Sequence, residues 1–240
     1  ETPMATVEIS QALLDRFKKL ATPTVYTAVR NRGATLCFME DVNPFTPGKK
    51  LAARARTLRS VPPRPDIHAD VTRGEDSPEY HAMGSCGPGD VLVVDCMRRA
   101  YSTVLGDIRL TQLMMQKADG LVTDGAVRDL DVVSGYGLAI FAQKRTPSAR
   151  EYGEGWEANV VVQCAGVAVR PGDVIVGDDD GVVVVPAYMA EEVATWCEIH
   201  EAAEELVKEK ILAERAIPGR YYPPTDAFKQ EMLKARGGKA

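Results

Sequence analysis

The sequence "GDIRLTQLMMQKADGLVTDGAVRD", residues 106–129, carries the strongest fold signal in the chain. Its first part predicts a helix that begins at Gly106-Asp107 and is closed by Gly120, and the apolar run "GLVTDG" predicts a buried strand. Another buried strand is predicted before it, in "GPGDVLVVDC" at residues 87–96. This β-α-β order favours an α/β fold in which the two strands run parallel.

The segments before this unit predict two helices and a strand. Ser10 is a candidate N-cap for "SQALLDRFKKL", whose apolar residues recur with the period of an amphipathic helix. Thr22-Pro23 predicts a second helix, with Thr22 as its cap and Gly33 closing it. Residues 49–61, "KKLAARARTLRSV", alternate and predict a strand, which leads into a long polar loop over residues 62–78.

The segments after this unit predict a second sheet and then a helix. Residues 138–147, "LAIFAQKRTP", are apolar at first and end at a proline. Short β-branched runs separated by Pro-Gly-Asp and Asp-Gly turns fill residues 158–187, which predicts the strands of a second sheet. The composition and apolar spacing of residues 188–216 predict a long helix with a solvated acidic face.

The composition argues against two classes of partner. The chain has 240 residues, of which 45% are hydrophobic and 26% charged, so it is large enough to bury a core. A net charge of -5 leaves no broad positive field for nucleic-acid binding. Because no apolar run reaches the roughly 18 residues of a membrane span, we expect a cytoplasmic protein without a membrane partner.

Cysteine and histidine do not form the common metal and nucleophile motifs. The five cysteines include no CxxC pair, which favours reduced, mostly buried thiols over a disulfide framework or zinc ribbon. Three histidines, His68, His81 and His200, nearly exclude a three-histidine metal site, and the "GxSxG" elbow of a Ser-His-Asp triad is absent. Although His68, Asp70, Glu79 and His81 are metal-ligand types, they follow no ligand spacing, so a solvated loop is favoured there.

Polar residues gather at one predicted edge of the sheet. At Gly106-Asp107 the first amides of the helix can bind a carboxylate or phosphate, although Asp107 acting as a cap is the simpler interpretation. Asp124-Gly125 is predicted to turn the chain at the end of the strand. Beyond it, Arg128 is suited to a carboxylate or 2-oxo acid, and Asp129 is a hard oxygen ligand for Mg2+ or Mn2+. The alternative is a surface ion pair, or a helix cap at Asp129.

These two motifs resemble a family signature. "GD" at Gly106-Asp107, followed at this separation by "DGAVRD" through Asp129, is similar to the RraA-like proteins, which include class II pyruvate aldolases acting on 4-hydroxy-4-methyl-2-oxoglutarate and 4-carboxy-4-hydroxy-2-oxoadipate. The resemblance extends from about Thr22 to Pro186. It implies an α/β fold, a swivelling β/β/α sandwich with N-terminal helices and a long C-terminal helix. It further implies a single domain over residues 1–240, with a core at about 22–186 and a helical extension over 187–240.

The resemblance also implies a reaction. Asp129 would bind Mg2+ or Mn2+ directly, Asp107 would hold a metal-bound water, and Arg128 would contact the oxo and carboxylate end of pyruvate. Cleavage of a 4-hydroxy-2-oxo acid next to its 2-oxo group generates a pyruvate enolate, whose charge a metal and a guanidinium stabilise. The same chemistry would decarboxylate oxaloacetate.

The backbone at the start of the helix would take part in substrate binding. The amides around Ile108 and Arg109, next to Gly106, would receive the substrate carboxylate. Arg109 stands where many family members have smaller or apolar residues. Our hypothesis is that Arg109 binds a second carboxylate or a sugar-acid hydroxyl.

The resemblance further implies homotrimers or homohexamers with active sites between subunits. A carboxylate from the C-terminal region of the neighbouring subunit would then approach the metal waters, with Glu205 as the candidate beside Glu204 and Glu209, although a solvated helix face explains all three. Two other functions stay open. One is a regulator that binds a ribonuclease, and the other is a lyase or dehydratase for a 2-keto-3-deoxy sugar acid, in which the polar loop at 62–85 would matter.

Overall fold

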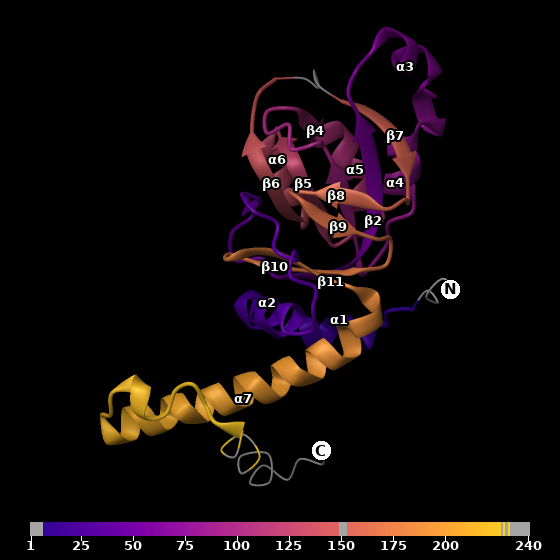
Figure 1. The fold of residues 1–240 in the computed structure, drawn as a ribbon. Coiled ribbons are helices and arrows are strands. Elements are labelled where there is room, and N and C mark those ends of the chain that lie inside the picture. The colour runs from indigo at the N-terminus through magenta and orange to yellow at the C-terminus, as the bar shows by residue number, and fades with distance from the viewer. Residues whose placement is uncertain (1–6, 149–152, 227, 229, 231–240) are drawn as a thin grey trace, which may run out of the picture.

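One large sheet organises the protein in the computed structural model, which describes residues 7–148, 153–226, 228 and 230 (Figure 1). Within these residues nine strands join in that sheet, in the order β1-β6-β5-β3-β2-β10-β11, with β4 beside β5 and β7 beside β2. The strands are β1 Asn43–Pro44, β2 Leu51–Val61, β3 Asp90–Asp95, β4 Thr103–Leu105, β5 Gly120–Val127, β6 Ala139–Arg145, β7 Glu154–Ala158, β10 Val174–Asp178 and β11 Gly181–Val185. A separate hairpin pairs β8 (Val162–Cys164) with β9 (Val167–Val169).

The predicted β-α-β unit is confirmed. β3 runs parallel to β5, and β4 also runs parallel to β5, with Leu105 beside Val127. Helix α5 (Asp107–Met115) starts directly after β4 and leads back to β5. The start of α5 and the end of β5 therefore lie at the same edge of the sheet.

Helices and the small hairpin cover the sheet (Figure 1), and the buried apolar side chains form three layers. The helices are α1 Gln11–Phe17, α2 Thr22–Arg30, α3 Pro65–Asp70, α4 Pro78–Gly84, α5, α6 Leu130–Val133 and α7 Ala190–Glu214, with short 3-10 turns at Gly74–Asp76, Ser134–Tyr136, Ala187–Met189 and Pro218–Arg220. Apolar residues of α4, α5 and α6 pack with β3 and β5 in one layer, and β8–β9 covers a second. α1, α2 and the first half of α7 form the third with β10 and β11.

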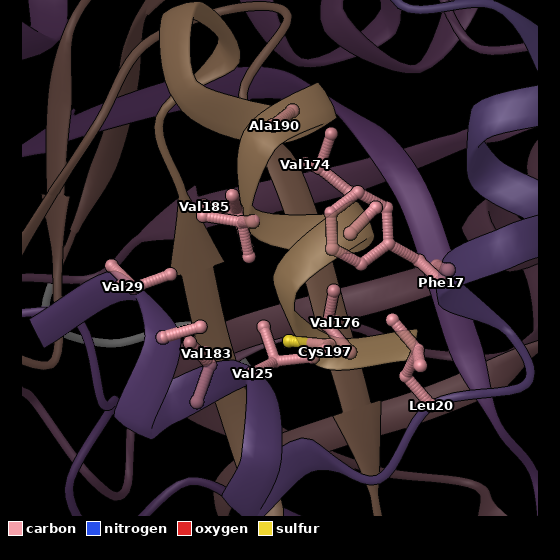
Figure 2. Close-up of a cluster of buried hydrophobic side chains, with 14 of the residues drawn as sticks. Phe17, Leu20, Val25, Val29, Val174, Val176, Val183, Val185, Ala190 and Cys197 are labelled. Atoms are coloured by element: carbon pink, nitrogen blue, oxygen red, sulfur yellow. The ribbon is translucent and has the colours of Figure 1, made fainter. Parts of the chain in front are cut away.

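Figure 2 shows the third layer, between the hairpin β10–β11 and the helices. Valines at every second position, Val174 and Val176 on β10 and Val183 and Val185 on β11, share one face because side chains alternate along a strand. Opposite them lie the buried helix residues Phe17, Val25, Val29, Ala190 and Cys197, and Leu20 from the turn between α1 and α2. α7 is thereby anchored by its first turns, and the rest of it extends away from the sheet (Figure 1).

The prediction of a second sheet over residues 158–187 is wrong for its last two strands. β10 pairs antiparallel with residues 51–54 of β2, and β11 pairs with β10, so both extend the large sheet. β2 is 11 residues long, and only residues 54–59 pair with β3. Its other edge is taken by β10 and β7, a pairing that strand periodicity alone does not specify.

The prediction of a loop over residues 62–78 is also wrong. α3, a 3-10 turn and the start of α4 occupy most of that segment. Pro65 and Pro78 stand in the first turns of the two helices, where proline needs no amide hydrogen. Ser77 caps α4 by accepting a hydrogen bond from the Tyr80 amide at 3.4 Å. A polar composition therefore concealed two proline-initiated helices.

Two predicted helix boundaries shift. α5 ends at Met115, and Gly120 opens β5 instead of closing the helix. A Cβ on Gly120 would overlap the Ala139 carbonyl on β6, so this glycine permits close strand packing. Likewise, the N-cap of α2 is Ala21, and Thr22 is the first helical residue.

The predicted Ser10 cap, the buried cysteines and the long helix near the C-terminus are confirmed. Ser10 caps α1 through a 3.2 Å hydrogen bond from the Leu13 amide. The five cysteines are free and buried, and α7 is the long helix predicted near the C-terminus. No helix in the described ranges has the length and apolar character needed to cross a bilayer. Residues 231–240 of the predicted extension lie outside the described residues.

Candidate active site

Asp107, Arg128 and Asp129 meet where β4 and β5 end. Asp129 Oδ2 accepts a hydrogen bond from the Asp107 amide at 3.1 Å and lies 3.2 Å from Arg128 Nε. The side chains of Arg128 and Asp129 are 38% and 35% exposed, so both are accessible to a ligand. The parallel pairing of the two short strand ends thus brings together residues that are 21 and 22 positions apart in the sequence (128 − 107 and 129 − 107).

Gly106 makes this close approach possible. Its backbone is extended, so glycine is not needed there for its φ angle. A Cβ on Gly106 would lie 2.7 Å from Arg128 Nε and closer still to Asp129 Oδ2. The absent side chain therefore leaves the space that the arginine and the aspartate occupy.

Asp129 has an unusual backbone conformation. With φ 58° and ψ 35° it is left-handed, which costs a residue other than glycine about 1 kcal/mol, although aspartate tolerates it better than most. Asp129 stands at the N-cap of α6, but its side chain makes no capping hydrogen bond. Asp129 is therefore the N-cap of α6 by position only, because its carboxylate points to the Asp107 amide instead. The ion pair with Arg128, the other interpretation, is present at 3.2 Å.

Asp107 and Arg128 differ in their hydrogen bonding. Asp107 Oδ1 accepts a hydrogen bond from the Ile108 amide at 2.7 Å, while Gly106 is the N-cap of α5. The Ile108 amide, expected to receive a substrate carboxylate, is thus already bonded to a carboxylate oxygen. Arg128 Nε is buried and, within the described residues, has no hydrogen-bond partner of good geometry.

A cavity of about 220 Å³ opens at these residues. Its wall combines backbone from β4 and α5 with polar side chains, and the residues are Tyr80, Thr103, Val104, Gly106, Asp107, Ile108, Arg109 and Arg128. Arg109 Nη1 also forms a 2.8 Å ion pair with the buried carboxylate of Glu79 on α4. The cavity can therefore present two guanidinium groups, those of Arg109 and Arg128, to a small anion.

Asp124 lies within β5. The prediction that Asp124-Gly125 turns the chain is wrong. β5 continues through Asp124-Gly125 to Val127. The Asp124 carboxylate is fully buried and accepts backbone hydrogen bonds from Cys96 at 2.6 Å, Arg98 at 2.9 Å and Ala165 at 3.1 Å. It thus ties the loop after β3 and the β8–β9 turn to β5, the strand that Arg128 directly follows.

A second buried carboxylate adjoins Asp124. Gln163 Nε2 donates to both Asp124 Oδ2, at 3.0 Å, and Asp95 Oδ1. Burial raises the pKa of Asp95, and the nearby Asp124 charge raises it further, while the hydrogen bond from the Met97 amide opposes the shift. Burial likewise raises the pKa of the Cys164 thiol, which makes it a poor nucleophile.

Several residues predicted as ligands lie elsewhere. Glu204, Glu205 and Glu209 are on α7, beyond the β10–β11 layer from α5 (Figure 1). Glu204 forms an ion pair with His200 at 3.2 Å. A carboxylate contributed by a neighbouring subunit stays a prediction. His68 bonds to Glu154 at 2.7 Å, and no group of three possible metal ligands occurs among the described residues.

Two residues near the site, Tyr80 and Asp124, were not predicted to lie in the elements where they occur. Tyr80 lines the cavity from α4, a helix that was partly predicted as a loop. Asp124 had been assigned to a turn, yet a lone carboxylate inside the apolar run of β5 was a signal of a buried, hydrogen-bonded group.

Known proteins are similar to this chain over most of its length. A family model described as "RraA-like: Aldolase/RraA" matches residues 22–184. Two curated relatives carry the name "Putative 4-hydroxy-4-methyl-2-oxoglutarate aldolase". The one from Halalkalibacterium halodurans is 29% identical over 215 residues, which is 89% of this chain and 96% of the relative. The one from Pseudomonas fluorescens is 38% identical over 101 residues, or 42% and 62% of the two chains.

Solved structures confirm the expected fold class. A Streptomyces coelicolor protein, described as an unusual member of the RNase ES inhibitor RraA protein family, is 29% identical with a TM-score of 0.77, covering 84% of this chain and 99% of its own. An uncharacterized protein from Pseudomonas syringae pv. tomato is 23% identical with a TM-score of 0.78, over 92% and 97% of the chains. The second likeness concerns the fold alone.

Proposed function

This chain belongs to the RraA-like family, as its motifs had indicated, and on that premise we propose that it is a divalent-metal-dependent lyase that cleaves a 4-hydroxy-2-oxo acid to pyruvate. The names of the two aldolase relatives support the lyase class. The observation that carries the proposal is the meeting of Asp129 Oδ2 with the Asp107 amide and Arg128 Nε, beside a cavity that Asp107 and Arg128 line.

The residues at this edge fit a hard divalent cation. Asp129 and Asp107 supply carboxylate oxygens, which Mg2+ and Mn2+ prefer. Mg2+ commonly takes one or two protein carboxylates and keeps several waters, so two aspartates suffice without a third acidic or imidazole ligand. Asp129 would bind the ion directly and Asp107 through water, and the bound ion would supply positive charge where an enolate develops.

The chain's own residues would position and deprotonate the substrate. The Arg128 guanidinium, whose buried Nε lacks a hydrogen-bond partner of good geometry within the described residues, would bind the carboxylate and 2-oxo oxygens. Asp107 Oδ2 would accept the proton of the C4 hydroxyl, directly or through one water. The C3–C4 bond then breaks, C4 becomes a carbonyl, and the electron pair forms the C2–C3 enolate. A proton added at C3 completes pyruvate.

The test measures the release of pyruvate in an assay coupled to lactate dehydrogenase. 4-Hydroxy-4-methyl-2-oxoglutarate and oxaloacetate are supplied with Mg2+ or Mn2+, and again with EDTA. We expect pyruvate from the first, and decarboxylation of the second, only with metal. Metal binding without turnover of any 4-hydroxy-2-oxo acid would contradict the proposal.

A second candidate is a regulator that binds a ribonuclease. The Streptomyces coelicolor structure, described as a member of an RNase inhibitor family, favours it. Such a protein has no evident need for Asp107, Arg128 and Asp129 together. Inhibition of a purified endoribonuclease that survives Asp129→Asn, with no metal-dependent turnover, would select the regulator.

A further inference from the structure

A second cavity of about 330 Å³ lies beside the candidate active site. The two cavities share Tyr80 and Arg109 as wall residues. The second is otherwise walled by the segment between β2 and β3, including His68, Arg73 and Glu79, and by Glu154 at the start of β7. The helical segment that had been predicted as a loop thus encloses space next to the site.

Arg109 is held between the two cavities by a buried carboxylate. Glu79 is only 7% exposed, and its Oε1 accepts a 2.8 Å hydrogen bond from Arg109 Nη1. The Arg109 side chain is 42% exposed, so it faces a cavity and is not enclosed by the fold. The bond to Glu79 engages Nη1, whereas a guanidinium carries five N–H donors in a rigid plane.

A second cation faces the same space. In the described part of the chain, Arg73 Nη2 bonds to the ring and carbonyl of His68 and to no carboxylate. His68 in turn contacts Glu154 Oε1 at 2.7 Å. Arg73 and Arg109 therefore both present guanidinium groups to one cavity, which suits an anionic group better than an apolar one.

We propose that this cavity receives the part of the substrate beyond C4, and that Arg109, positioned by Glu79, binds a carboxylate at that end. The inference rests on the proposed lyase function and assigns the residues that would select a substrate with a second carboxylate, namely Arg109 and its partner Glu79. Arg128 would bind the pyruvate end of the substrate, and Arg109 would bind the end beyond C4, here called the acceptor end. The two arginines would thus select for a dianion.

The competing interpretation is a purely structural ion pair that joins α4 to α5. Loss of such a pair would lower activity toward every substrate alike. The test therefore compares two substrates that differ only at the distal group. These are 4-hydroxy-4-methyl-2-oxoglutarate and 4-hydroxy-4-methyl-2-oxopentanoate, in which a methyl group replaces the distal carboxylate.

Arg109→Gln should lower kcat/KM for the dianion roughly 10- to 100-fold, as loss of one charged hydrogen bond predicts, and for the monoanion by less than about twofold. Glu79→Gln should change the ratio in the same direction and mainly through KM, because it frees Arg109 without removing its charge. Arg109→Lys, which keeps the charge, should retain part of the preference. The matched control is Arg64→Gln, since Arg64 pairs with Asp66 at 2.6 Å and does not line the cavity.

Equal losses for both substrates, or no loss for either, would overturn the inference. A separate measurement identifies failure of the proposed function itself. Exchange of the pyruvate methyl protons in D2O, followed by NMR, needs enolate formation but no acceptor end. If the wild-type protein exchanges the pyruvate protons, and Arg109→Gln leaves the ratio of kcat/KM for the two substrates unchanged, this inference alone is overturned. A wild-type protein that neither exchanges pyruvate protons nor cleaves either substrate overturns both.

Discussion

Asp124 and Asp129 lie five positions apart in the sequence and have opposite environments. Asp124 is fully buried inside β5 and accepts hydrogen bonds from three backbone amides and from Gln163. Asp129 is partly exposed, left-handed and bonded to one backbone amide, that of Asp107. The difference teaches that burial and the number of donors, not the residue type, decide which carboxylate supports the fold and which can bind a ligand.

The two environments are also connected. Asp124 binds the amides of Cys96 and Arg98, in the loop that leads from β3 to β4. β4 then places Gly106 beside Asp129. The buried Asp124 carboxylate therefore holds the backbone that positions Gly106 beside the Asp129 carboxylate. Each aspartate can be substituted separately.

Asp129→Asn should give the largest effect, on activity alone. It removes the charge that would bind the metal while keeping a side chain that tolerates the left-handed conformation. We expect kcat/KM for pyruvate release to fall roughly 1000-fold or more, with a melting temperature within about 2 °C of wild type. Asp131→Asn is the matched control, because Asp131 is an exposed carboxylate two positions on. Full activity in Asp129→Asn would show that the site is assigned wrongly.

Asp124→Ala should give the largest effect on stability. It leaves the buried amides of Cys96, Arg98 and Ala165 without their acceptor, which we expect to cost about 3–5 kcal/mol. Urea unfolding would measure the change in the free energy of unfolding. A loss below about 1 kcal/mol would break the contrast with Asp129, since Asp124 would then be no more than a tolerated buried group.

Gly106→Ala should lower activity less than Asp129→Asn and stability less than Asp124→Ala. The new Cβ would meet the Asp129 carboxylate and the Arg128 side chain at Nε and Cγ, and none of these nearest contacts is a backbone atom. We expect kcat/KM to fall roughly 10- to 100-fold, because small displacements of catalytic groups are costly, and the free energy of unfolding to change by less than about 1 kcal/mol. Unaltered kinetics in a folded Gly106→Ala protein would mean that the three groups need not approach this closely.

The sequence predicted the elements that depend on local pattern. The β-α-β unit, the Ser10 cap and α7 follow from periodicity and capping chemistry, and the structure has them. The β10–β11 hairpin joins the large sheet instead of forming a second one, because strand patterns do not specify partners. The proline-initiated helices α3 and α4 were hidden by their polar composition.

The candidate site was predicted only in part, for the same reason. The separation of Gly106-Asp107 from Arg128-Asp129 was visible, and parallel pairing of β4 and β5 brings the two motifs together. The pairing of Arg109 with Glu79 was not visible, because the two residues are 30 positions apart on different helices. Nor was the burial of Asp124, since "TDG" is equally typical of a turn.

Asp95, which is buried next to Asp124, allows a test with a smaller expected effect. Its pKa is raised above the ordinary value of 3.8, first by burial and then by the Asp124 charge, against the hydrogen bonds from Met97 and Gln163. Between its unfolded and folded pKa values the folded protein binds more protons than the unfolded chain. The free energy of unfolding therefore falls as pH rises through that window.

Asp95→Asn removes this titration and keeps an oxygen that can accept the Met97 and Gln163 hydrogen bonds. Relative to wild type, the variant should gain stability as pH rises from about 4, and the difference should level off once the pH exceeds the folded pKa of Asp95. Urea unfolding of both proteins between about pH 4 and pH 7 measures this difference. Asp131→Asn, which changes an exposed carboxylate, should show no such trend. If the difference in free energy of unfolding between variant and wild type stays constant with pH, burial does not raise the pKa of Asp95. The contrast between the buried carboxylates and the exposed Asp129 would then be weaker than their environments suggest.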